Sequence, residues 1–164
     1  MKAIVYTSNT GHTESYAKLL GEKTGLPVYS LDDAKALDKQ TPILYLGWLF
    51  ASSIRDYRTA AKKFKITAVI AVGLCDTGTA LKQTRKANGI PEEIPLFTVQ
   101  GGMDKTKLYG INKFMIRMLT KAMEGKKVKT ADDNRMIYLL KNDQNYVCEE
   151  NLTAFLEWYG EKLP

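Results

Sequence analysis

The residues best suited to hold a ligand follow the first apolar run of the chain. That run, residues 3–6, is rich in strand-forming residues, and a polar segment without lysine or arginine, residues 7–13, comes directly after it. Hydroxyl and amide groups of this segment can donate hydrogen bonds, and Gly11 allows the backbone to fold closely around a ligand. A helix that begins near Thr13 would direct free N–H groups and the positive end of its dipole at the same place. The segment therefore predicts a site that holds an anion, at this place a phosphate, through hydrogen bonds alone.

Short apolar runs alternate with helical patterns around this segment. Strands are predicted for five runs, at residues 3–6, 27–31, 43–46, 66–74 and 95–99. Helices are predicted between them, at residues 14–23, 56–65 and 79–87. Strands that alternate with helices are typical of an α/β fold, in which helices cover both faces of a parallel sheet. Because parallel strands end at one edge of a sheet, the loops after the first, third and fourth strands are expected to surround one site.

The chain continues after the fifth strand for longer than a single closing helix needs. A strong helix is predicted for residues 108–123, with Lys113, Arg117 and Lys121 repeating every four residues on one face. The apolar residues predicted to form its buried stripe are Ile111, Phe114, Met115, Met118, Leu119 and Ala122. Residues 135–141 form a short apolar run that fits a helix or a strand. A closing helix is predicted with an apolar face made of Cys148, Leu152, Phe155, Leu156, Tyr159 and Leu163.

Composition limits the class of protein. The chain has 164 residues, of which 45% are hydrophobic and 26% charged, and this predicts one globular domain over residues 1–164. The net charge is +6, but Tyr109 is the lone candidate for an exposed aromatic residue among the clustered basic residues, so no nucleic-acid partner is expected. Cys75 and Cys148 form no C-x-x-C pair, which argues against a metal site and favours a reduced, cytoplasmic protein. No stretch approaches the roughly 18 apolar residues of a membrane span.

The order of residues in the polar segment resembles that of a known family. Ser8-Asn9-Thr10-Gly11-His12-Thr13 is similar to the phosphate-binding loop of flavodoxins, which reads Ser/Thr-x-Thr-Gly-x-Thr after the first strand. Residues 46–51 and 72–76 lie where flavodoxins carry their two flavin-binding loops. The resemblance implies a flavodoxin-like doubly wound five-stranded parallel sheet of order 2-1-3-4-5, with an inserted helix after strand five. It also implies FMN as the cofactor.

The resemblance further implies which residues bind FMN. They belong to the three loops at the strand ends: Thr7, Ser8, Asn9, Thr10, Gly11, His12, Thr13, Trp48, Leu49, Phe50, Ala51, Ser52, Gly73, Leu74, Cys75, Asp76 and Thr77. For Trp48, stacking on the flavin ring and packing in the core are both open. His12 fills a variable position of the loop or takes part in acid–base chemistry, and Cys75 is an apolar filler or a reactive thiol. Asp76 is expected to accept hydrogen bonds from the flavin, and no catalytic residue or metal ligand is predicted.

The tail of the chain has its own resemblance. Gln100-Gly101-Gly102, Tyr109 and Lys113-Phe114-Met115-Ile116-Arg117 are similar to the flavodoxin-domain subgroup that contains menaquinone-dependent protoporphyrinogen oxidase. The predicted function is FMN-dependent electron transfer. The alternatives are a flavin-dependent oxidase of the protoporphyrinogen-oxidase type and a flavin-free interaction module. The predicted partners are a redox protein or a small-molecule or quinone acceptor, and an anionic surface at the inner face of the membrane is expected to dock on Lys113, Arg117 and Lys121.

Two features depart from the flavodoxin pattern. Flavodoxins commonly have Gly-Asp in the first flavin loop, whereas this chain has Ala51-Ser52-Ser53. Because a Cβ penalises positive φ, we expect Ser52 to lack the backbone freedom of that glycine. Flavodoxins that carry electrons are typically acidic and dock on basic partners, whereas the net charge here is +6.

Overall fold

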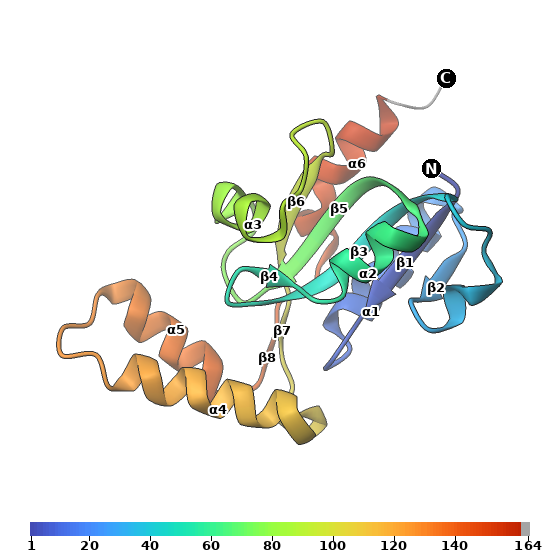
Figure 1. The fold of residues 1–164 in the computed structure, drawn as a ribbon. Helices are drawn as coiled ribbons and strands as arrows, with labels where there is room; N and C mark the ends of the chain where they lie inside the picture. Colours follow the sequence, from blue (N-terminus) through green and yellow to red (C-terminus); the bar gives the residue numbers. More distant parts are fainter. Residues whose placement is uncertain (162–164) are drawn as a thin grey trace.

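A parallel sheet forms the centre of the molecule. A computed structural model of the chain describes residues 1–161 (Figure 1). Five parallel strands lie in the order β2-β1-β3-β5-β6, which is the predicted order 2-1-3-4-5 when they are counted along the chain. Their bounds are β1 (Ala3–Thr7), β2 (Val28–Ser30), β3 (Pro42–Phe50), β5 (Lys65–Gly73) and β6 (Leu96–Gln100). The prediction of five strands was incomplete, because a turn after β3 adds the short antiparallel strand β4 (Ser53–Ile54).

Helices cover both faces of this sheet (Figure 1). On one face α1 (His12–Thr24), the 3₁₀ turn η3 (Glu149–Leu152) and α6 (Thr153–Gly160) enclose one apolar cluster that includes Leu20 and Phe155. On the other face η1 (Asp33–Ala36) and α2 (Tyr57–Lys63) enclose a second cluster, and α3 (Leu81–Asn88) packs on β4 and β6. The middle of β3 and β5 is buried, as expected for strands covered on both faces.

The closing helix follows most of the predicted pattern. Leu152 and Phe155 are buried, and Phe155 stacks on Tyr159 with ring centroids 5.8 Å apart. Cys148 is exposed, so its predicted place on the apolar face was wrong. The backbone is still extended at Cys148, and the turn that follows it is a 3₁₀ helix. The α-helical spacing that was used to place Cys148 therefore does not apply before Thr153. Leu163 lies outside the described residues.

Residues 102–145 form an insert between β6 and η3. A two-stranded antiparallel ribbon of β7 (Gly102–Met103) and β8 (Gln144–Asn145) leaves the sheet and carries a pair of helices, α4 (Gly110–Glu124) and α5 (Ala131–Lys141) (Figure 1). The turn η2 (Lys105–Lys107) joins β7 to α4. One inserted helix was predicted and two are found. The run left open between helix and strand is the helix α5, which begins with a capping box between Thr130 and Asp133.

The buried stripe predicted for α4 was wrong at most of its positions. Ile111, Phe114 and Met118 are 69%, 63% and 52% exposed, and Ala122 is exposed as well. Leu119 does face inward as predicted, and together with Ile116 and Met123 it packs against a small cluster of residues from the insert and from the loop after β5. The physical reason is that apolar residues run around most of α4, and a pair of helices has too little surface to cover them all.

Candidate functional site

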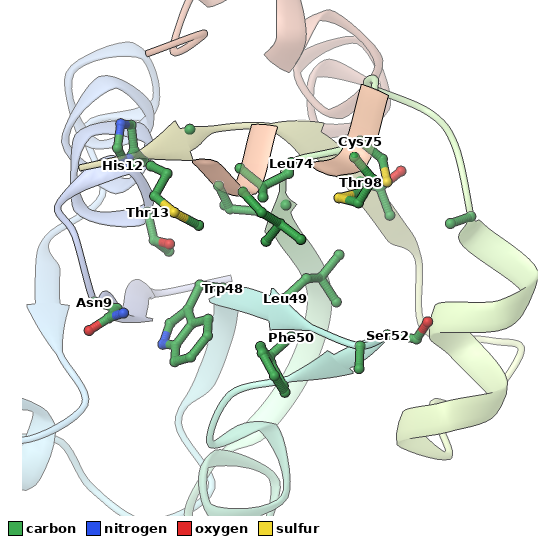
Figure 2. A pocket seen from close by; sticks show the side chains of 18 of the residues that line it. Asn9, His12, Thr13, Trp48, Leu49, Phe50, Ser52, Leu74, Cys75 and Thr98 are labelled. Atoms are coloured by element: carbon green, nitrogen blue, oxygen red, sulfur yellow. The ribbon is translucent and has the colours of Figure 1, made fainter. Parts of the chain in front are cut away.

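A cavity lies where the carboxyl ends of β1, β3 and β5 face the insert. Its volume is about 340 Å³, within the range of small-molecule sites. Most of the residues predicted to bind a cofactor line it: Ser8, Asn9, Thr10, His12, Thr13, Trp48, Leu49, Phe50, Ala51, Ser52, Gly73, Leu74, Cys75 and Asp76. Figure 2 shows Asn9, His12 and Thr13 on one side of the cavity, with Trp48 and Phe50 on another. The topology of the sheet therefore brings the three predicted loops together.

Three predicted residues lie outside the cavity lining. The hydroxyl of Thr7 accepts a hydrogen bond of 3.0 Å from the buried Tyr45. The hydroxyl of Thr77 donates to Asn151 at 2.6 Å and accepts from the N–H of Gln100 at 3.0 Å. Gly11 forms the turn itself. Thr7 and Thr77 therefore support the loops from behind and do not face the cavity.

The loop between β1 and α1 has the shape of an anion cradle. Gly11 precedes the helix with φ of 98°, in the left-handed region that favours glycine, and no side chain of the described residues caps the helix there. The hydroxyl of Ser8 accepts a hydrogen bond of 3.2 Å from the N–H of Gly11. The hydroxyl of Thr10 lies 3.0 Å from Nδ1 of His12, and Thr13 is buried. The first turn of α1 therefore keeps N–H groups available to an anion.

Lys107 brings a positive charge to this loop. Its Nζ lies 3.6 Å from the point that a Cβ on Gly11 would occupy, so the amino group stands directly over the turn. Lys107 comes from η2 of the insert and also pairs with Asp104 at 3.3 Å. Hydrogen bonds alone were expected at this loop, because the loop itself contains no lysine or arginine, and Lys107 was not among the predicted binding residues. The spacing of Asp104 and Lys107 predicts a local turn, but it does not predict that this turn lies next to Gly11.

His12 connects the cradle to the insert. Its ring lies against Gly102 of β7 and the backbone carbonyl of Gln144 in β8. Burial lowers the pKa of His12, and Lys107 adds to that effect, while Asp104 and the Gln144 carbonyl oppose it. The imidazole is therefore mainly neutral at neutral pH, with one nitrogen able to donate a hydrogen bond.

Two polar contacts hold the helices of the insert over the cavity. The amide of Asn112 in α4 donates to Oδ1 of Asn9 at 3.0 Å. The guanidinium of Arg135 in α5 donates to both oxygens of Asp76, at 2.6 and 2.5 Å. This pairing lowers the pKa of Asp76. The carboxylate that was predicted to accept hydrogen bonds from a flavin is thus already engaged by the insert.

The rest of the cavity is largely apolar. Trp48, Leu49 and Phe50 at the end of β3 form one wall, and Leu74 lies across from them (Figure 2). The insert adds a roof whose apolar residues are Met103, Leu108, Ile116, Leu119, Met123, Met136 and Leu140. Trp48 is half-buried, and the Arg55 guanidinium stands 5.9 Å from its ring centroid. Of the two roles considered for Trp48, its position in the lining favours contact with a ligand over burial in the core.

The turn between β3 and β4 is held in an unusual backbone conformation. Ala51 and Ser52 have φ of 47° and 66°, so Ser52 adopts the backbone region that its Cβ was expected to penalise. The side chain of the buried Asn88 explains this. It donates to the carbonyl of Ser52 at 2.8 Å and accepts from the N–H of Ile54 at 2.8 Å. A two-residue hairpin turn requires positive φ, and these bonds offset the strain.

Cys75 lies at the edge of the cavity. Partial burial of its thiol, followed by the nearby charge of Asp76, raises the pKa of Cys75. The thiol is therefore protonated at neutral pH, which disfavours the reactive role that the sequence left open. No three His, Cys, Asp or Glu side chains within residues 1–161 lie close enough together to hold a metal ion.

The sequence and the structure were compared with known proteins. No protein-family model matches the chain, and neither the curated proteins nor the solved structures contain a significant match. The likeness to flavodoxins therefore stays a resemblance, carried by the order of the loop residues. Among the helices within residues 1–161, none is long and apolar enough to cross a membrane.

Proposed function

We propose that the chain is a flavodoxin-like protein that binds FMN in this cavity and transfers electrons. The observation that carries the proposal is the cradle at Gly11. The Lys107 amino group lies 3.6 Å from the point that a Cβ on Gly11 would occupy, so a positive charge faces this turn at close range. Uncapped N–H groups, hydroxyl groups and one cation converge there, and an apolar cavity adjoins them. This donor set fits the phosphate and the flat ring of FMN.

Different residues of the site would bind different parts of FMN. Thr10, the N–H groups of α1 and Lys107 would hold the phosphate, and a neutral His12, whose single N–H faces the Gln144 carbonyl, would hold the loop against the insert. Trp48 and Phe50 would contact one side of the flavin ring, while the roof of the insert would exclude water. FMN supplies the electron-transfer chemistry when it is bound, and the protein supplies position and environment. Its electrons would pass to a redox protein or to a small-molecule or quinone acceptor.

Titration with three flavins tests this proposal. Chain freed of any ligand is mixed with FMN, riboflavin or FAD, and binding is followed by quenching of flavin fluorescence. We expect FMN to bind most tightly, because riboflavin lacks the phosphate and the sequence carries no second nucleotide-binding motif for the adenylate of FAD. The absorption spectrum and the mass of any ligand released from the freshly purified protein give an independent check.

Two substitutions locate the phosphate. Thr10→Ala should weaken FMN binding by about 1–2 kcal/mol, the scale of a hydrogen bond to a charged partner. Gly11→Val should weaken it more, since a branched side chain both fills the cradle and opposes positive φ. Thr59→Ala, on the exposed side of α2, is the matched control and should bind FMN like the parent chain. Riboflavin binding as tight as FMN binding would refute the cradle, and no binding of any flavin would favour the flavin-free interaction module.

A further inference from the structure

The insert exposes a continuous apolar stripe. Ile111, Phe114 and Met118 follow one another at spacings of three and four residues, which places them on one face of α4. Tyr109, the residue just before the helix, is also apolar in its ring and is 76% exposed. We call these four residues the outer stripe. A cluster of large apolar side chains exposed to water commonly marks a surface that binds an apolar partner.

A row of basic residues runs beside the outer stripe. Lys113, Arg117 and Lys121 are spaced four residues apart, and within residues 1–161 no carboxylate pairs with any of them. Like charges at this spacing repel one another along a helix. We call these three residues the basic row. An anionic partner would relieve the repulsion that the folded chain leaves in place.

A groove of about 380 Å³ opens along the basic row. Its charged lining residues are all cationic: Lys105, Lys113, Arg117, Lys121 and Lys141. Its floor is formed by the apolar side chains of Leu108, Ile116 and Leu140. Lys141 is already paired with Glu124 at 2.9 Å, and the amino group of Lys105 donates to the Lys141 carbonyl at 2.9 Å. The basic row therefore supplies the charges that are left for a partner. The groove is thus shaped and charged for small anionic groups that lie next to apolar matter.

We propose that the outer stripe and the basic row form a docking surface for a bilayer that contains anionic phospholipid. Lipid phosphates would occupy the groove, and the outer stripe would enter the boundary between headgroups and acyl chains. Tyr109 suits that boundary, because its ring is apolar and its hydroxyl is polar. A second copy of the chain is a poorer occupant, because two copies that met face to face would bring their basic rows together.

Vesicle sedimentation tests the charge component. The purified chain is mixed with phosphatidylcholine vesicles, with or without phosphatidylglycerol, and the bound fraction is measured at increasing salt. We expect binding to the anionic vesicles that weakens as salt rises. Changing Lys113, Arg117 and Lys121 together to Gln should weaken it on the order of 100-fold. Changing Arg58, Lys62 and Lys63 of α2 together to Gln removes the same net charge elsewhere and should change binding far less.

A second set of variants tests the apolar component. Changing Ile111, Phe114 and Met118 together to Ser should abolish the binding that survives at high salt, whereas Leu81→Ser, at an exposed position on α3, should not. All five proteins are compared by circular dichroism, so a loss of binding is separated from a loss of folding. The measurement is made with and without FMN, and its outcome is therefore independent of the proposed flavin site.

Five outcomes would overturn the lipid assignment. Equal binding to neutral and anionic vesicles would show that the basic row plays no part. If the Gln variant of the basic row and the Gln variant of α2 lost equal amounts of binding, net charge alone would explain the attraction. Release of the chain by glycerol phosphate at constant ionic strength would assign the groove to a soluble anion. Absence of vesicle binding, with self-association that the Ser variant removes, would assign the outer stripe to a second copy. If neither vesicle binding nor self-association were seen, an acidic protein would be the remaining partner for this surface.

Discussion

The sheet and the insert use similar helices in opposite ways. Helix α1 buries Tyr16, Ala17 and Leu20 against the sheet, whereas α4 has no fully buried residue although it is longer. A sheet offers a broad apolar face on which one helix can bury its whole stripe, but the helices of the insert have mainly each other. The spacing of apolar residues therefore shows that a helix has an apolar face. Whether that face is buried depends on how much apolar surface the neighbouring elements offer.

The two regions also differ in what holds them. Two large apolar clusters fix the helices to the sheet. The insert has a small cluster, and polar contacts such as Asn112 to Asn9 and Arg135 to Asp76 attach it to the loops of the cavity. Regions with few buried apolar contacts open at lower free energy than a core. The roof of the cavity is accordingly its most easily moved part, which suits a site that must admit a ligand.

The largest expected effect contrasts one phenylalanine from each region. Phe155 in α6 is 1% exposed and packs edge-on against Phe97 at 5.5 Å. Phe155→Ala should lower the free energy of unfolding by about 3–5 kcal/mol. Phe114→Ala in α4 should change it by no more than about 0.5 kcal/mol, because that side chain is mostly in water. Urea unfolding of both variants measures the difference, and a large loss for Phe114 would show that α4 is covered in solution.

Most of the sheet was predictable because its signals are local. A continuous run of strand-forming residues, followed by polar turn residues, marks β1 and β5 without reference to the rest of the chain. The place of the cavity then follows from topology, since parallel strands deliver their loops to one edge. The three loops found around the cavity could therefore be expected once the strands were assigned.

The unpredicted parts depend on residues far apart in sequence. The turn at Ala51 and Ser52 is held by Asn88, whose amide reaches it from the end of α3. Lys107 reaches Gly11 only because the insert folds back over the first loop. The outward face of α4 depends in the same way on how little surface α5 offers. None of these pairings leaves a periodic trace in the sequence.

A smaller effect tests whether the anion cradle belongs to both regions. Lys107→Gln removes the charge that the insert brings to the loop and should weaken FMN binding roughly tenfold, because a charge-assisted contact to the phosphate is lost. Riboflavin binding should not change. Lys105→Gln is the matched control, since the amino group of Lys105 is in the same turn but bonds the carbonyl of Lys141 at 2.9 Å. Equal FMN affinities for the two variants would mean that the loop binds the phosphate without the insert.

The smallest expected effect concerns the Asp76–Arg135 pair, which joins the two regions at the surface. Arg135 lowers the pKa of Asp76 below its value of about 3.9 in an unfolded chain. Because the folded pKa is the lower one, the contribution of the pair is fully present above the unfolded pKa and is lost as pH falls through the folded pKa. Hydrogen-exchange protection factors of α5 should therefore be constant from neutral pH to about pH 5 and should decline below about pH 4.

Arg135→Gln separates this pair from other carboxylates of the insert. Asp104 and Asp133 also have lowered pKa values, from hydrogen bonds to Thr106 and to Lys126, so both proteins should lose protection in acid. At neutral pH the variant should exchange the amides of α5 on the order of a few-fold faster, with unchanged protection in β5, because exposed ion pairs contribute little to global stability. The gap between variant and parent should close as Asp76 becomes protonated. A gap that persists in acid would show that Arg135 holds the insert by packing and not by charge.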